Sequence, residues 1–186
     1  VVDNGVDCEK FKPLAAGPTT APIVLFVGSF GHTPNRDAIG WLFSEIWPRI
    51  RAERPDARLQ VVGAHAPPEI LAADGRDGIE VVGTVPDTAA YYRDARVLLA
   101  PVRAGSGTRL KILEAFASGV PVVTTHLGAE GIAAQDGEHL LTAESAPELA
   151  AATCRVLADD FLARRLGESA RALAERRYDW RRSAEE

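Results

Sequence analysis

The chain has 186 residues, a formal net charge of −5 and a hydrophobic share of 46%. This length fits one globular domain, and the negative charge argues against nucleic acid as a partner. No apolar run reaches membrane-spanning length and no secretory leader is recognisable, so we expect a cytoplasmic protein. The two cysteines, Cys8 and Cys154, are far apart in sequence and show no metal-binding or redox spacing.

The first 22 residues are predicted to form a linker, because proline and glycine punctuate them and no apolar period is visible. A continuous apolar run at 23–27 then predicts a buried strand, which ends at Gly28. A helix is expected from about Asn35, with Asn35 itself as the N-cap. Pro48 lies inside this helical pattern, so we expect a kink or an early end there.

The rest of the chain continues the alternation of strands and helices. Further strands are predicted at 58–63, 79–82, 97–100, 121–125 and 140–142, short helices at 68–73 and 88–94, a helix at 109–118, and two long helices within 147–178. This alternation predicts a doubly wound, Rossmann-like α/β domain with a parallel sheet of about six strands and C-terminal helices. Ligands bind such sheets beyond the carboxyl ends of the strands.

The segment 101–119 carries the clearest chemical signal. A glycine-rich loop at 105–108 opens a helix, and the free N–H groups at a helix N-terminus favour an anion such as phosphate. On a helical wheel Lys111 and Glu114 share one face, together with Gly107 and Ser118. A lysine for pyrophosphate charge beside a carboxylate for ribose hydroxyls is what a nucleoside diphosphate requires.

Two alternatives remain open at this stage. Lys111 and Glu114 are spaced as a solvated i,i+3 ion pair, which would stabilise the helix by only a few tenths of a kcal/mol. Arg109 lies off their face and would either reach a phosphate or point into solvent. The opposite side of the helix is expected to face the core and carries Leu110, Leu113 and Ala117.

This segment resembles the donor-binding signature of the retaining glycosyltransferases of group 1, also called family 4, which have the GT-B fold. The matching residues are Pro101, Gly105, Gly107, Lys111, Glu114, Ala115, Phe116, Ala117, Gly119, Pro121, Val122 and Val123. Weaker matches run through nearly the whole chain in register: Asn4 to Asp7, Phe26 to Ser29, Gly83 to Val85, Tyr92, Gly128, Glu130, Tyr178 and Trp180.

The resemblance implies transfer of a sugar, with retention, from a UDP- or GDP-linked sugar to a glycan or lipid-linked acceptor. It implies no cofactor and no metal. It also implies that residues 1–22 are an interdomain linker, that residues 23–186 are the nucleotide-sugar-binding domain, and that an N-terminal acceptor domain is absent from this chain. Peripheral contact with the inner membrane face is an additional expectation, raised by the arginine-rich C-terminal stretch.

Positions carried over from the family give roles to individual residues. Glu114 would bind the ribose hydroxyls, and Thr84 and Val85 would hold the base through main-chain atoms. The diphosphate would be bound by Lys111, Arg109 and the backbone of Gly107 and Thr108. Glu130 and the first-strand residues Gly28, Ser29 and Asn35 would lie beside the donor.

Three positions depart from the family pattern. Ser106 stands where the family often has its first glutamate, so no catalytic residue is assigned, and Ser29 and Asn35 stand where it commonly has arginine and lysine. Two rival functions therefore stay open: a nucleotide-sugar epimerase of the same fold, and a non-catalytic nucleotide-binding module. The run 28–31 lacks the third glycine of a dinucleotide fingerprint, and no Asp-x-Asp motif occurs, so NAD binding and a metal-dependent transferase are not expected.

Overall fold

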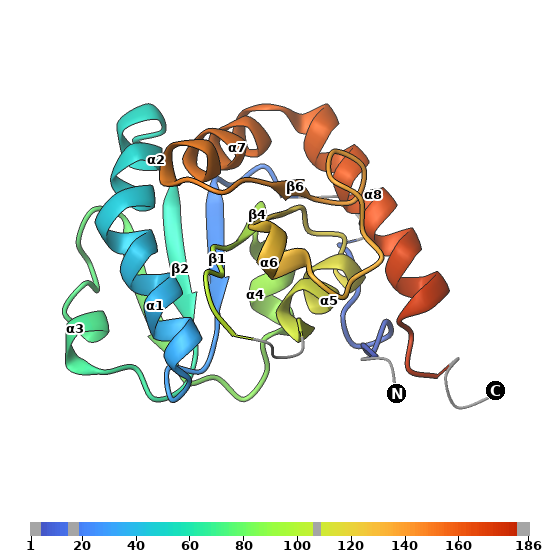
Figure 1. Ribbon diagram of the computed structural model, residues 1–186, viewed down its shortest axis with the longest axis horizontal. Helices are drawn as coiled ribbons and strands as arrows, with labels where there is room; N and C mark the ends of the chain where they lie inside the picture. Colours follow the sequence, from blue (N-terminus) through green and yellow to red (C-terminus); the bar gives the residue numbers. More distant parts are fainter. Residues whose placement is uncertain (1–4, 15–18, 106–108, 182–186) are drawn as a thin grey trace.

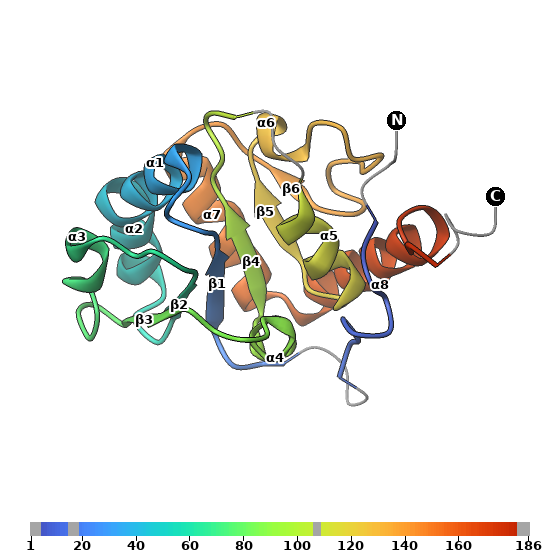
Figure 2. The same cartoon turned by 90° about the horizontal axis from the view of Figure 1, so that it is seen from below.

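The computed structural model describes residues 5–14, 19–105 and 109–181. Six strands form one parallel sheet in the order β3-β2-β1-β4-β5-β6, as Figure 2 shows. Figure 1 shows β1 and β2 side by side in this sheet. The strands are β1 (Ile23–Val27), β2 (Arg58–Val62), β3 (Ile79–Gly83), β4 (Val97–Ala100), β5 (Val122–Thr124) and β6 (Leu141–Thr142). The order reverses between β1 and β4, which confirms the predicted doubly wound sheet. Ligands of such sheets bind at the carboxyl ends of the strands beside this switch point, a region that we call the crevice.

Helices cover both faces of the sheet. They are α1 (Thr33–Trp41), the π-helical turn η1 (Leu42–Ile46), α2 (Trp47–Glu53), α3 (Pro68–Leu71), α4 (Ala89–Asp94), α5 (Leu110–Ala117), α6 (His126–Ala129), α7 (Ala146–Ala158) and α8 (Asp160–Arg177). Figure 2 shows α4 and α5 on the near side of the sheet and α7 behind it. Because both faces are covered, two hydrophobic clusters form, one against α1, α2 and α7 and the other against α4, α5 and α8.

The first helix differs from its prediction at both ends. Asn35 is not the N-cap: the helix begins at Thr33, and His32 takes the cap position. Pro34 lies in the first turn, where its missing N–H is not needed, so the helix starts before Asn35. The helix does not end early at Pro48, because α2 continues to Glu53, but its regular geometry is interrupted by the π-helical turn just before the proline.

The π-helical turn explains why Pro48 is tolerated. The N–H of Trp47 donates to the carbonyl of Leu42, five residues back. This wider turn lies directly before the proline, so the preceding carbonyls are displaced from the place where the ring would clash. Both halves of the helix thereby keep an apolar face on the sheet, with Ile39 and Ile50 fully buried.

The described part of the predicted linker packs against the domain. Val6, Cys8 and Phe11 are buried. The N–H of Val6 donates to the carbonyl of Tyr178 at 2.7 Å, so this segment pairs with the chain that follows α8. Arg171 of α8 donates to the carbonyls of Cys8 (3.0 Å) and Phe11 (2.7 Å). Residues 5–14 are therefore held on the domain by both backbone and side-chain bonds, and we call them the N-terminal segment.

The start of α7 offers a test of local stability. The Ser145 hydroxyl accepts from the N–H of Glu148 at 3.4 Å, and the Glu148 carboxylate accepts from the N–H of Ser145 at 3.0 Å, which is a capping box. Ser145→Ala should therefore lower the free energy of unfolding by about 1 kcal/mol. Urea denaturation measures this, with Ser44→Ala at an exposed helical position as the control. Equal effects of the two changes would show that the cap contributes nothing.

No helix in the described ranges is both long enough and apolar enough to cross a lipid bilayer. Both cysteines are free thiols in the buried interior, and burial raises the pKa of each to about 11. At neutral pH they are therefore protonated, poorly reactive thiols that contribute to packing.

Candidate functional site

The carboxyl ends of β1 and β4 bring two loops and two helix N-termini together. The loop after β1 leads into α1, and the loop after β4 leads into α5. Gly28 ends β1 so close to α1 that a Cβ there would lie 2.8 Å from Cγ of Asn35. Gly105 of the second loop is equally close to Pro34, since a Cβ on it would lie 2.9 Å from the proline Cγ. Both glycines are required for the close approach of α1 to these loops.

Lys111, in the first turn of α5, links the two sides of the crevice. Its Nζ donates to Oδ1 of Asn35 at 2.8 Å, and Nδ2 of Asn35 donates to the carbonyl of Ser29 at 2.7 Å. The same Nζ lies 5.3 Å from the ring centroid of Phe26. Burial, together with the charge of Arg109, lowers the pKa of Lys111 to about 8, and the charge of Glu114 opposes this shift. The lysine is thus a desolvated cation with a neutral hydrogen-bond partner.

Glu114 lies one turn further along α5 and has its own partner. Its Oε2 accepts from the hydroxyl of Tyr92 at 2.8 Å, and that hydroxyl also lies 3.1 Å from the carbonyl of Lys111. Burial raises the pKa of Glu114, an effect that the bond from Tyr92 partly offsets. No ion pair joins Lys111 to Glu114 in the structure, so the solvated-pair alternative is wrong for these two described residues.

Tyr92 belongs to the candidate site through its bond to Glu114, although the sequence predicts no role for it. It is fully buried on α4, where burial and the neighbouring carboxylate raise its pKa well above the usual value. Its hydroxyl therefore remains a hydrogen-bond donor at physiological pH. Only its match to the family pattern distinguishes it in the sequence, since an aromatic residue on an apolar helix face reads as core.

Arg109 takes a position that neither sequence alternative anticipated. Its Nη2 donates to the carbonyls of Leu127 (2.7 Å) and Gly105 (3.1 Å), and it thereby ties the loop after β4 to α6. Its Nε is buried and has no hydrogen-bond partner among the described residues. The neighbouring Leu110 does not join the core as predicted: it is 43% exposed, because it begins the helix at the edge of the crevice, whereas Leu113 is buried.

Among the described residues, the side chains of Thr84, Val85 and Glu130 form no hydrogen bond or ion pair with Lys111 or Glu114. Thr84 is exposed and Val85 half-buried in the loop after β3, and Glu130 is exposed after α6. Ser106, Gly107 and Thr108 lie outside the described residues. In the described part of the chain no three His, Cys, Asp or Glu side chains converge where they could hold a metal ion.

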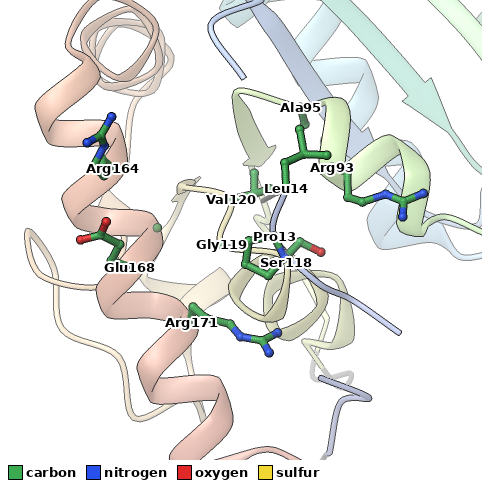
Figure 3. A pocket seen from close by; sticks show the side chains of 11 residues that line it. Pro13, Leu14, Arg93, Ala95, Ser118, Gly119, Val120, Arg164, Glu168 and Arg171 are labelled. Atoms are coloured by element: carbon green, nitrogen blue, oxygen red, sulfur yellow. The ribbon is translucent and has the colours of Figure 1, made fainter. Parts of the chain in front are cut away.

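A separate pocket lies at the other end of α5, between that helix, α8 and the N-terminal segment (Figure 3). Its volume is about 210 Å³, and its lining includes Ser118, Arg171 and Pro13. Ser118 shares a helical face with Glu114 on the wheel, but it lies at the far end of the helix, buried and 4% exposed. None of the predicted site residues lines this pocket, so it is distinct from the crevice that holds Lys111.

Comparison with known proteins assigns the family. The family model described as "Glycosyl transferases group 1" matches residues 21–159, well over half of the chain. The chain belongs to the group 1 glycosyltransferases.

A curated mannosyltransferase is among the relatives of the chain. The chain is 34% identical to the phosphatidyl-myo-inositol mannosyltransferase of Mycolicibacterium smegmatis, over 96% of this chain and 48% of the relative. Nearly the whole of this chain takes part in the match to these curated relatives, but it spans only about half of their length.

Solved structures share the fold. The sucrose-phosphate synthase of Thermosynechococcus elongatus is 27% identical, with a TM-score of 0.78 over 97% of this chain and 49% of that one. Anabaena HepE, solved in complex with UDP and glucose, is 19% identical, with a TM-score of 0.75 over 98% of this chain and 54% of that one. At this low identity the second likeness speaks for the fold alone.

The lowered pKa of Lys111 gives a pH dependence. Below about pH 8 the lysine is a cation, and above it the amine is increasingly neutral. We therefore expect affinity for UDP to fall as the pH rises from 7.5 to 9.5, by at most about tenfold per pH unit. Calorimetry across this range measures the fall, and Lys111→Met is the control that should abolish it. A flat profile for the native chain would show that Lys111 does not contact the phosphates.

Proposed function

We propose that this chain is the nucleotide-sugar-binding half of an enzyme that transfers a sugar from a UDP- or GDP-linked sugar to a glycan or lipid-linked acceptor, with retention. One observation carries the proposal: a desolvated Lys111 and a half-buried Glu114 stand one turn apart at the switch point of the sheet, each held by a neutral partner. Neither charge is neutralised by the other, so both are available to a ligand.

The two charged residues would bind different parts of the nucleotide. Lys111 is closest to the loop after β1 and supplies positive charge for a diphosphate, which its short bond to Asn35 orients. Glu114 lies on the α4 side, where its second carboxylate oxygen is free to accept from ribose hydroxyls while Oε2 accepts from Tyr92. A nucleotide would therefore run across α5 with its phosphates toward β1 and its base toward the loop after β3.

Binding at this site would stabilise the leaving group of a sugar transfer. When the bond between the sugar and the diphosphate breaks, negative charge develops on the diphosphate, and a fixed cation lowers the energy of that charge. Lys111 holds this position without reorganisation because Asn35 and the ring of Phe26 constrain it. The residues that would hold the acceptor belong, in this proposal, to an N-terminal half, which is consistent with relatives about twice as long.

The test compares the chain 1–186 with the same chain joined to its native N-terminal half. The isolated chain should bind UDP or GDP without acceptor-dependent turnover, because half of the catalytic cleft is absent. The joined protein should release nucleoside diphosphate only when an acceptor is present. Release without acceptor and with an altered sugar would favour the epimerase, and no nucleotide binding would favour the non-catalytic module. Full transfer by the isolated chain would overturn the proposal of a half enzyme.

A further inference from the structure

The N-terminal segment contacts the loop that precedes α4. Nζ of Lys10 lies 3.1 Å from Oδ1 of Asp87, with about half of each side chain exposed. Oδ1 of Asp87 also accepts from the N–H of Ala89, the first residue of α4, at 3.1 Å. The ion pair therefore joins the segment to the end of the loop at 84–88.

The next residue of the segment reaches the same helix from the inside. Phe11 is 5% exposed and packs edge-on against Tyr92, with ring centroids 5.7 Å apart. Tyr92 in turn donates to Glu114. Two consecutive residues of the segment thus contact this region, Lys10 at Asp87 just before α4 and Phe11 at the tyrosine that holds the proposed ribose-binding carboxylate.

The segment is fixed firmly enough to act as a support. Arg171 binds two of its carbonyls, and Val6 pairs with Tyr178. The charges of Lys10 and Asp87 both act on the carboxyl of Glu114, the first lowering and the second raising its pKa. The ion pair therefore lies within electrostatic reach of the crevice.

We propose that Lys10 is a positioning residue of the nucleotide site, which holds the loop carrying Thr84 and Val85 in place through Asp87. This inference rests on the proposed function, in which that loop binds the base. It assigns the N-terminal segment a part in nucleoside recognition as well as in joining two domains. Movement of the segment would be transmitted to the base loop through this one ion pair.

Lys12 provides a matched control. It is exposed to a similar degree and is also ion-paired, but its partner, Glu9, lies within the segment itself. Lys10→Met should weaken binding of UDP about two- to fivefold, the range for an exposed ion pair. Lys12→Met should leave it unchanged, and Lys10→Arg should restore it. Affinity for inorganic pyrophosphate, which has no nucleoside, should be equal in all four proteins.

Hydrogen exchange in the ligand-free chain separates this inference from the proposed function. Lys10→Met should speed amide exchange in residues 84–89, and Lys12→Met should not. If the native chain binds no nucleotide but exchange behaves as described, the proposed function fails, whereas the role of Lys10 in holding the loop through Asp87 stands. Unchanged exchange in Lys10→Met, or an equal loss of UDP and pyrophosphate affinity, would overturn the inference.

Discussion

Replacing Glu114 with glutamine should weaken UDP binding by about 1.5–3 kcal/mol, the range for hydrogen bonds to a charged group. The amide oxygen of glutamine can still accept from Tyr92, so the local fold should be retained. What is lost is the carboxylate oxygen that would accept from the ribose. Titration calorimetry with UDP and with 2′-deoxy-UDP should show that the variant discriminates less between the two.

The same substitution should not destabilise the protein at neutral pH. Burial raises the pKa of Glu114 in the folded state, so folding favours the protonated carboxyl. The associated stability is present below the unfolded pKa and is lost as the pH rises through the folded pKa. Above the folded pKa the native protein carries a buried charge that glutamine lacks, so the variant should be at least as stable there. Thermal unfolding at pH 7 measures this, with Glu168→Gln on the exposed face of α8 as the control. A large drop in the unfolding temperature of Glu114→Gln would indicate a structural carboxylate.

Lys111→Met should reduce affinity for UDP ten- to a hundredfold, which corresponds to about 1.4–2.8 kcal/mol. Methionine keeps the apolar contact with Phe26 but removes the charge beside the loop after β1. Affinity for uridine, which has no phosphate, should stay the same. Because burial disfavours the lysine cation, the variant should be as stable as the native chain or more so.

Lys12→Met serves as the control for the loss of one lysine charge at a site outside the crevice. Equal weakening of UDP and uridine by Lys111→Met would assign the lysine to the support of the fold. Loss of UDP binding alone, with the unfolding temperature preserved, is the result that a phosphate contact requires.

The sheet was predictable because its strands are short apolar runs that end at turn residues. All six strands and their parallel arrangement follow from this pattern, with boundaries that differ by no more than one residue. The start of α1 was not predictable in this way. Asn35 has the propensity of an N-cap, but its side chain instead forms hydrogen bonds with Ser29 and Lys111. Pro48 correctly marks an irregular place in the helix, but the π-helical turn that lets the helix continue past it has no signal in the hydrophobic period.

The sequence predicts Lys111, Glu114 and Asn35 as site residues, but it predicts neither the bond between Lys111 and Asn35 nor the part of Tyr92. Lys111 and Glu114 follow a glycine-rich loop on one helical face, which a wheel shows directly. Their hydrogen-bond partners, Asn35 and Tyr92, lie 76 and 22 positions away in sequence, and only the folded sheet brings them close. The packing of the N-terminal segment on the domain was likewise not predictable. An extended stretch that buries only isolated side chains shows no hydrophobic period, so the sequence predicts only a linker there.

The proposed function suggests chimeras in which the nucleotide-sugar-binding half of one family member is joined to the acceptor-binding half of another. Their folding depends on where the junction between the two sequences is made. A junction at Ile23, where the sheet begins, would separate the domain from Val6 and Phe11, which are buried in it. It would also leave Arg171 without the two carbonyls that it binds in the N-terminal segment. A chimera should therefore take residues 5–14 from the same parent as α8, with the junction placed before residue 5.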